Sequence, residues 1–335
     1  MTKKQIGIFS IVAFAIPVLL GILMAIVFKG GNSTGIFTAT WMFLPASGVM
    51  LGQLLMKKQD KDRPALPKGF IITFLVTTVV MIGLCFAALF FNGDKLVSVA
   101  TLIFLASSIA SLITLGVAGK ERRKAYGLNF PKPGRAILVV LLFIALYCAL
   151  LFGSIIIEQL MLGEAINLSL NLGLSQYLTL ASLIPSLFVM FTPYFGEEYG
   201  WRYFLGPILQ KKFGKRTGII ILGVIWGLWH LPINIFFYSP DTALQSILQQ
   251  VIGCVAFAVF FAWAYMKTDG NIWALSAIHF LNNNIGGALL SSDGSNREVT
   301  WQTVLVSLVV YAVIFLPFLL AKEYSKKKDS VKLPA

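Results

Sequence analysis

The amino-acid sequence predicts an all-α protein, a polytopic membrane helix bundle of about ten transmembrane helices with both termini in the cytoplasm. Three observations indicate this class. Hydrophobic residues make up 57% of the 335 residues and charged residues only 12%, whereas soluble domains carry about 25% charged residues. Apolar runs of roughly 20 residues, long enough to cross a bilayer as a helix, recur along the whole chain. The basic residues gather in the short segments between these runs.

Ten spans are expected from the hydropathy and the flanking charges. They cover residues 6–28, 36–56, 69–91, 96–118, 136–157, 181–210, 217–238, 244–266, 272–290 and 301–321. With the N-terminus inside, all but three of the 27 Lys and Arg residues lie on the cytoplasmic side. The exceptions are Lys29, Lys95 and Arg297. Membrane orientation therefore accounts for the net charge of +13, and we expect the lipid bilayer, not nucleic acid, as a partner.

The segment 158–180, between the fifth and sixth spans, is too polar to cross the membrane comfortably and too apolar for a free loop. It alternates apolar residues with Ser and Asn, and it carries Glu158 and Glu164. We expect an interfacial segment on the extracytoplasmic side, with both carboxylates solvated.

The sixth span contains the charged stretch Gly196-Glu197-Glu198-Tyr199-Gly200-Trp201-Arg202. A charged side chain near the bilayer centre costs at least about 2.5–3.5 kcal/mol, so three of them require a reason. In a helix Glu198 and Arg202 share a face and can pair, whereas Glu197 lies about 100° round the helix. We therefore predict a structural Glu198–Arg202 pair and a Glu197 carboxylate that points into the bundle. The glycines at 196 and 200 leave room for close helix approach or a water-filled cavity.

The two histidines of the chain, His230 and His279, also lie inside apolar runs. Trp226 precedes His230 by four residues, so its indole can wall the imidazole, and Asn283 follows His279 by four residues. Counted from the cytoplasmic helix ends, Glu197, His230, His279 and Asn283 all fall roughly 12–21 Å deep. This shared depth predicts one site built from three helices.

Two chemistries suit these groups. A carboxylate and an imidazole can activate water, while a second imidazole and an amide donate to a developing oxyanion. Alternatively, the imidazoles with a carboxylate or amide oxygen could hold a divalent metal whose bound water attacks. The chain has no HExxH motif, no Asp inside a span and no evident Ser–His pair. Water-dependent hydrolysis of an amide bond within the membrane is the reaction that these residues favour.

Three ordered motifs carry a family resemblance. Glu197-Glu198-x-x-x-Arg202, then Trp226-x-x-x-His230, then His279-x-x-x-Asn283 resemble the motifs of the CPBP family. This family comprises CAAX prenyl endopeptidases of the Ras-converting type together with bacterial Abi and bacteriocin-processing proteins. The resemblance covers about residues 180–290, and Trp226 stands where the family usually has Phe.

The resemblance implies a role for each matching residue. Glu197 would be the catalytic base with His230, and Glu198 with Arg202 would support the site. His279 and Asn283 would bind the oxyanion or complete a metal site. If a divalent metal such as zinc is bound, its ligands would come from Glu197, His230, His279 and Asn283.

These expectations divide the chain into four parts. Residues 1–157 form the N-terminal transmembrane helices, 158–180 the interfacial segment, 181–290 the catalytic core, and 291–335 the last span with a basic cytoplasmic tail.

We expect an intramembrane endopeptidase of a bacterial plasma membrane, with its site open toward the cytoplasm. Its substrate would be a membrane-anchored peptide or lipidated protein, such as a prenylated CAAX-like tail or a leader or bacteriocin peptide. The sequence leaves the oligomeric state undetermined.

Two other functions stay open at this point. The first is a non-proteolytic immunity or scaffold protein of the same architecture, because a fold does not by itself fix an activity. The second is a proton-coupled transporter with Glu197 and the histidines as a proton relay. The transporter hypothesis is weakened because the two halves of the chain show no internal repeat and the functional groups crowd into three late helices.

Overall fold

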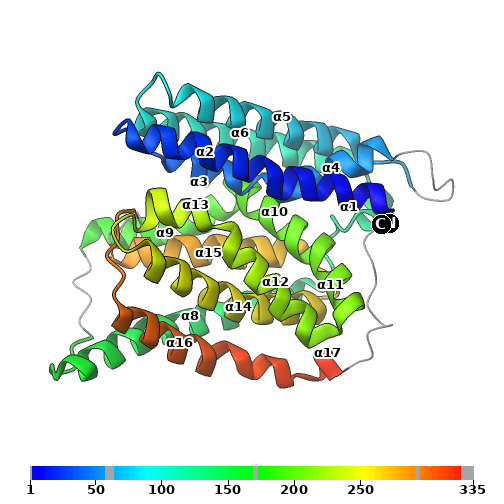
Figure 1. Ribbon diagram of the computed structural model, residues 1–335. Helices are drawn as coiled ribbons and strands as arrows, with labels where there is room; N and C mark the ends of the chain where they lie inside the picture. The colour runs from blue at the N-terminus through cyan, green and yellow to red at the C-terminus, as the bar shows by residue number, and fades with distance from the viewer. Residues whose placement is uncertain (1, 57–63, 169–172, 291–294, 326–335) are drawn as a thin grey trace.

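The computed structural model describes residues 2–56, 64–168, 173–290 and 295–325, and within these ranges every regular element is a helix (Figure 1). The all-α prediction is therefore confirmed. The first half of the chain forms α1 (Lys3–Ser10), η1 (Ile11–Ala15), α2 (Ile16–Lys29), α3 (Gly35–Trp41), α4 (Leu44–Leu55), α5 (Lys68–Ala87), α6 (Gly93–Val117), α7 (Lys120–Ala125) and α8 (Pro133–Leu162).

The second half contains shorter helical pieces around the predicted site. They are α9 (Leu174–Val189), α10 (Thr192–Glu198), η2 (Tyr199–Leu205), α11 (Gly206–Phe213), α12 (Lys215–Trp229), α13 (Leu231–Ile233), η3 (Asn234–Tyr238), α14 (Ala243–Lys267), α15 (Ile272–Leu290), α16 (Trp301–Phe315), η4 (Leu316–Leu320) and α17 (Lys322–Ser325). Three of the breaks, η1, η2 and η3, are π-helical turns, a feature that is frequent at functional sites.

The number of membrane spans agrees closely with the expectation of about ten. Among the described residues, seven helices are long and apolar enough to cross a membrane, and nine if two bent pairs each count as one span. The bends are 66° between α9 and α10–α11, and 41° between α12 and α13–η3. The remaining predicted span, 272–290, is helix α15, which is not among the nine because His279 and three asparagines lower its mean hydropathy. The chain is an integral, multi-pass membrane protein.

The helices form two layers, and α10 lies between them. In Figure 1, α1, α2, α4, α5 and α6 lie together on one side, and α8, α12, α14, α15 and α16 make up the other. Helix α10 packs against α4 in the first layer and α15 in the second. The carboxylate stretch is thus placed at the layer boundary, where it can meet side chains from both.

The bundle has two chemically different ends, on the right and left of Figure 1. We call the end formed by segments 64–67, 118–132, 214 and 268–271 the basic end, because the lysines and arginines concentrate there. The opposite end is formed by segments 30–34, 88–92, 239–242 and 295–300. The basic tail expected after the last span, 326–335, lies outside the described residues.

Glycines set the close helix contacts around α10 and α12. A Cβ on Gly196 would collide with the Met42 carbonyl, and one on Gly200 would collide with Pro45. A Cβ on Gly227 would come within 2.6 Å of the Val251 Cα. The close helix approach predicted for the glycines at 196 and 200 is therefore confirmed. Only glycine lets these backbones come so near, as is common in membrane bundles.

The segment predicted to be interfacial is only partly described. Helix α8 continues to Leu162, beyond the expected end of the fifth span at residue 157, and α9 begins at Leu174. Glu158 is half-buried and Glu164 is exposed. Residues 169–172 of the segment lie outside the described residues, and its position at the membrane surface stays a prediction.

Candidate active site

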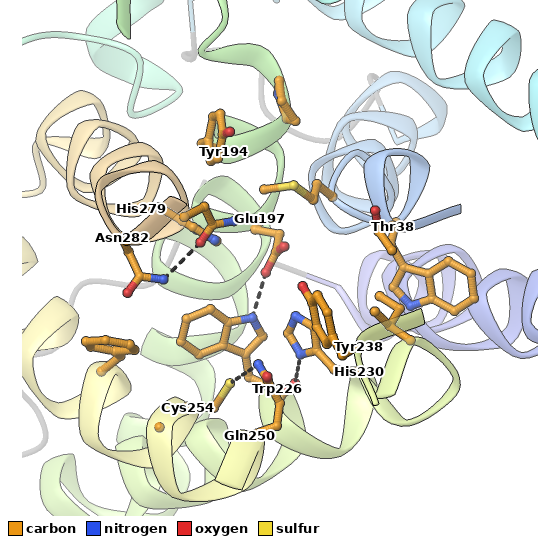
Figure 2. Close-up of a pocket in the computed structure, with 18 of the residues that line it drawn as sticks. Thr38, Tyr194, Glu197, Trp226, His230, Tyr238, Gln250, Cys254, His279 and Asn282 are labelled. Atoms are coloured by element: carbon orange, nitrogen blue, oxygen red, sulfur yellow. Dashed lines mark hydrogen bonds between the residues drawn. The ribbon is translucent and has the colours of Figure 1, made fainter. Parts of the chain in front are cut away.

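Glu197 is buried at the end of α10 and is held by two tryptophans. Its exposed fraction is 2%, and its Oε2 accepts hydrogen bonds from Trp226 Nε1 at 2.6 Å and Trp201 Nε1 at 3.2 Å. Figure 2 shows the Trp226 bond at the edge of the pocket. Within the described residues Oε1 accepts no further hydrogen bond, so this oxygen is left for water or substrate.

Glu198 contacts both Arg202 and His279 and is completely buried. Its Oε2 lies 3.2 Å from Arg202 Nε, which confirms the predicted pair. Its Oε1 lies 2.8 Å from His279 Nδ1, a contact between two helices that the spacing did not predict. An ionised carboxylate can only accept, so the proton of this bond is on His279 Nδ1. Glu198 therefore orients a ring of the site in addition to neutralising Arg202.

The Arg202 guanidinium is buried among aromatic rings rather than hydrogen-bond acceptors. It lies 4.3 Å from the centroid of Trp226 and 4.9 Å from that of Phe261. Its contact with Glu198 is an ion pair without hydrogen-bond alignment, and within the described chain its N–H groups have no hydrogen-bond partner. The cation thus depends on the Glu198 charge and on cation–π attraction.

The two imidazoles are held alike and present the same nitrogen to the pocket. His230 Nδ1 lies 2.7 Å from the Trp226 carbonyl oxygen. A carbonyl oxygen can only accept, so the Nδ1 proton is on the His230 ring. Nδ1 is thus occupied in both His230 and His279, and Nε2 of each ring has no hydrogen-bond partner among the described residues. In a neutral ring it accepts a proton, and in a protonated ring it donates, which is the state that oxyanion binding by His279 would need.

Asn283 shares the pocket with these groups but is the most exposed of the four predicted residues. Its Oδ1 accepts a hydrogen bond of 2.9 Å from Asn282 Nδ2, which leaves the Asn283 amide N–H groups for other partners. Asn284, next along α15, donates to the Tyr194 hydroxyl at 2.9 Å. The His279–Asn283 spacing thus delivers an imidazole and an amide to one cavity, as expected.

Sequence reasoning missed part of the role of the tryptophans. Trp226 was expected to wall His230, and their ring centroids are 6.1 Å apart, but its indole N–H bonds to Glu197. Trp201 was not singled out at all. It follows Glu197 by four residues just as Arg202 follows Glu198, so the same spacing rule would have found it.

A cavity of about 600 Å³ brings the four predicted residues Glu197, His230, His279 and Asn283 together (Figure 2). The four residues thus meet at one cavity, and their depth in the membrane stays a prediction. Trp201, Arg202 and Ile278, which lie toward the basic end, are at most 2% exposed and do not line the cavity. On the other side, the lining continues through Thr38, Ile233, Tyr238, Gln249, Gln250, Gly287 and Arg297.

The direction of this cavity bears on two expectations drawn from the sequence. We expected both a cytoplasmic basic end and a site open toward the cytoplasm. The lining beyond the carboxylate and imidazoles instead belongs to helix halves that finish in segments 30–34, 239–242 and 295–300. The cavity extends away from the basic end, so the two expectations are incompatible. The position of a residue along its helix gives its distance from the membrane surfaces. It does not show toward which surface the cavity extends.

The cavity residues include side-chain types that commonly bind a metal, but these side chains do not lie close enough together to form a metal site. Two free imidazole nitrogens, each with its other nitrogen hydrogen-bonded, and one carboxylate are typical zinc ligands. In the described ranges, however, no three His, Cys, Asp or Glu side chains lie close enough together to hold an ion.

Comparison with known proteins identifies the class of this site. Residues 178–285 match the family model described as Type II CAAX prenyl endopeptidase Rce1-like. Over 137 residues the chain is 28% identical to a protein of Methanococcus maripaludis named CAAX prenyl protease 2. That match covers 39% of this chain and 49% of the relative, so the chain spans about half the length of the curated protein it matches. No solved structure matches.

All three motifs lie inside the matched range. The helices that surround the cavity carry the Glu-Glu-x-x-x-Arg motif and both histidine motifs. Residues 178–285 are thus similar to the Rce1-like endopeptidase domain, and this similarity supports a CPBP family protease.

We predict that Trp226→Phe lowers the catalytic rate about 10- to 100-fold, because a hydrogen bond to a buried charged group contributes about 1.5–3 kcal/mol. Phe keeps an aromatic ring but is smaller than the indole, so thermal unfolding is measured beside the kinetics to separate lost packing from the lost hydrogen bond. Trp201→Phe, which removes the longer bond, should cost less. Steady-state kinetics on both variants check this order, and equal loss from both would contradict the geometry.

Proposed function

We propose that this chain is an intramembrane endopeptidase that hydrolyses a peptide bond of a membrane-tethered peptide. One observation carries the proposal: Glu197 and the two imidazoles, His230 and His279, line one cavity. The family match supports peptidase chemistry, and the burial of Glu197 supports a base that works away from bulk solvent.

The proposed reaction begins with a water between Glu197 and His230. Glu197 Oε1 takes a proton from this water, with His230 Nε2 as a second acceptor, and the hydroxide adds to the scissile carbonyl carbon. A protonated His279 and the Asn283 amide donate to the oxygen that becomes negative. Collapse of this intermediate breaks the C–N bond, and the proton held by Glu197 passes to the leaving amine. The products are a carboxylic acid and an amine.

The tryptophans and Glu198 position these groups. Two indole N–H donors fix one oxygen of Glu197 and so aim the other into the cavity. Glu198 holds the His279 ring through its hydrogen bond to Nδ1, which leaves Nε2 free of this contact. Glu198 thus has two roles: it orients His279 in the site, and it neutralises the buried Arg202.

We place the basic end in the cytoplasm of a bacterial plasma membrane, by the excess of Lys and Arg there. The cavity then extends toward the extracytoplasmic half of the bilayer. Substrates compatible with this site are membrane-anchored peptides, either a prenylated CAAX-like tail or a leader or bacteriocin peptide. Peptides that reach the outer half of the bilayer fit the direction of the cavity best.

The test is a cleavage assay with purified protein in lipid nanodiscs. Prenylated CAAX-like peptides and hydrophobic leader peptides are offered to the wild type and to Glu197→Ala, with products identified by mass spectrometry. We expect one peptide class to be cut by the wild type alone. Equal cleavage by both proteins would show that Glu197 is not the base, and no cleavage of any peptide would favour the immunity or scaffold function.

The metal hypothesis is tested on the same preparations. Metal content is measured for the wild type and for a variant that lacks His230 and His279, and activity is measured before and after chelation. From the spacing of the donors we expect activity to survive chelation. Stoichiometric zinc in the wild type only, with activity lost on chelation and restored by zinc, would show that the side chains close around an ion.

A further inference from the structure

A second cavity, of about 380 Å³, lies at the basic end, between the beginning of α5 and the end of α6. It shares no lining residue with the cavity of Glu197, and its volume falls within the range of small-molecule sites, about 300–1,000 Å³. Helices α5 and α6 pack against each other in the first layer (Figure 1), and both are long and apolar enough to cross a membrane. A cavity where one begins and the other ends therefore lies near the membrane surface.

Two basic side chains line the second cavity, Lys68 on α5 and Arg122 on α7. Both are exposed, and neither belongs to an ion pair in the part of the chain that the structure describes. Glu121 precedes Arg122 on α7, but no acidic side chain of the described residues lines the cavity. An ammonium and a guanidinium are both well suited to bind phosphate oxygens. The charge of the cavity therefore favours an anion.

Apolar walls continue from the second cavity onto the outer surface of α6. Ile113 and Val117 line the cavity and are 63% and 83% exposed. Ile109 is also exposed, and the three residues follow one another at four-residue spacing along one face of the helix. A ligand with an anionic head and an apolar chain can contact the cations and this stripe together. A small soluble anion can use only the cations.

Hydrogen bonds join the walls of the second cavity to the segment that follows Glu198. The Tyr126 hydroxyl donates to the Pro64 carbonyl at 3.0 Å, and the Tyr199 hydroxyl donates to the Tyr126 carbonyl at 2.8 Å. Leu66, which lines the cavity, is buried. Segment 64–67 is thus tied to the residue after α7, and that residue to η2. The cavity is therefore formed in the absence of a ligand, which lowers the cost of binding one.

We propose that the second cavity binds one anionic phospholipid. Lys68 and Arg122 contact its headgroup phosphate, and an acyl chain lies along the apolar stripe of α6. A basic pocket between membrane-spanning helices is the kind of site that anionic headgroups occupy. The bound lipid would hold α5, α6 and α7 together and stabilise the folded protein, because it binds only where these elements meet. This site is separate from the active cavity and does not depend on the proposed peptidase function.

The test measures lipid binding to the purified full-length chain in nonionic detergent. Phosphatidylglycerol or phosphatidylcholine is titrated, retained lipid is counted by native mass spectrometry, and thermal unfolding is followed in parallel. We expect one phosphatidylglycerol to bind in preference to phosphatidylcholine and to raise the Tm more. Lys68→Gln/Arg122→Gln should lower the affinity for phosphatidylglycerol on the order of 30-fold, because each basic residue beside anionic lipid contributes about fivefold. Affinity for phosphatidylcholine should not change.

Arg135→Gln/Lys211→Gln is the matched control. It also removes one arginine and one lysine, both exposed near the basic end and outside both cavities, and it should keep the affinity of the wild type. Equal affinity for the two lipids, or a preference that survives Lys68→Gln/Arg122→Gln, would overturn the proposal. An equal loss in the control would show diffuse attraction to the whole basic end. A last arm adds inorganic phosphate in place of lipid, and an equal rise in Tm would show a site for free phosphate, which would also overturn it.

Discussion

Glu198→Leu is expected to destabilise the folded protein by about 3–5 kcal/mol and to abolish cleavage, because it leaves a buried cation without its counter-charge. Arg202 is 2% exposed and its N–H groups have no other acceptor within the described chain. The same change removes the acceptor of His279 Nδ1. Stability is measured by denaturant or thermal unfolding in micelles, and activity by the peptide assay.

The double variant Glu198→Leu/Arg202→Leu separates the two roles of Glu198. Replacing both members of a buried pair with apolar residues is often neutral or stabilising, so most of the lost stability should return. Activity should not return, because His279 stays without an orienting carboxylate. A stable and active double variant would show that Glu198 serves the fold alone, and a stable single variant would contradict the burial argument.

Glu197→Gln is expected to lower kcat by about 10²- to 10⁴-fold, the usual contribution of a general base. The amide oxygen can still accept the Trp226 hydrogen bond, and the volume is almost unchanged, so folding should be preserved. KM should change little, since the residue acts on water in the reaction step and not on substrate binding.

Glu164→Gln provides the matched control for this substitution. It makes the same chemical change at an exposed glutamate outside the cavity, so its kinetics and stability should equal those of the wild type. Substantial activity in Glu197→Gln, with the control behaving as expected, would mean that another group activates the water. His230 would then be the first candidate, since its Nε2 is free.

Local spacing made much of the candidate site predictable. Glu198 and Arg202 are four positions apart and therefore share one helix face, and the ion pair is present at 3.2 Å. Equal depth along three helices places Glu197, His230 and His279 in one layer, and all three border one cavity. These predictions succeed because a helix in a bilayer has a fixed rise and a fixed direction.

Contacts between helices could not be read in the same way. The Glu198–His279 bond joins residues 81 positions apart, and the Trp226–Glu197 bond joins residues 29 positions apart. Both depend on how α10, α12 and α15 are rotated against one another. Glycine contacts such as Gly200 against Pro45 contribute to setting that rotation, and no periodicity in the sequence reports it.

The sequence by itself therefore determined the class of protein, the helical spans, the charged motif and the depth at which its partners lie, because bilayer thickness and helix geometry are general constraints. The tertiary structure determined which side-chain atoms of different helices are in contact. It gave Glu197 its two indole donors, gave Glu198 a second partner in His279, and directed the cavity lining away from the basic end. These features follow from side-chain packing between helices, which neither hydropathy nor spacing encodes.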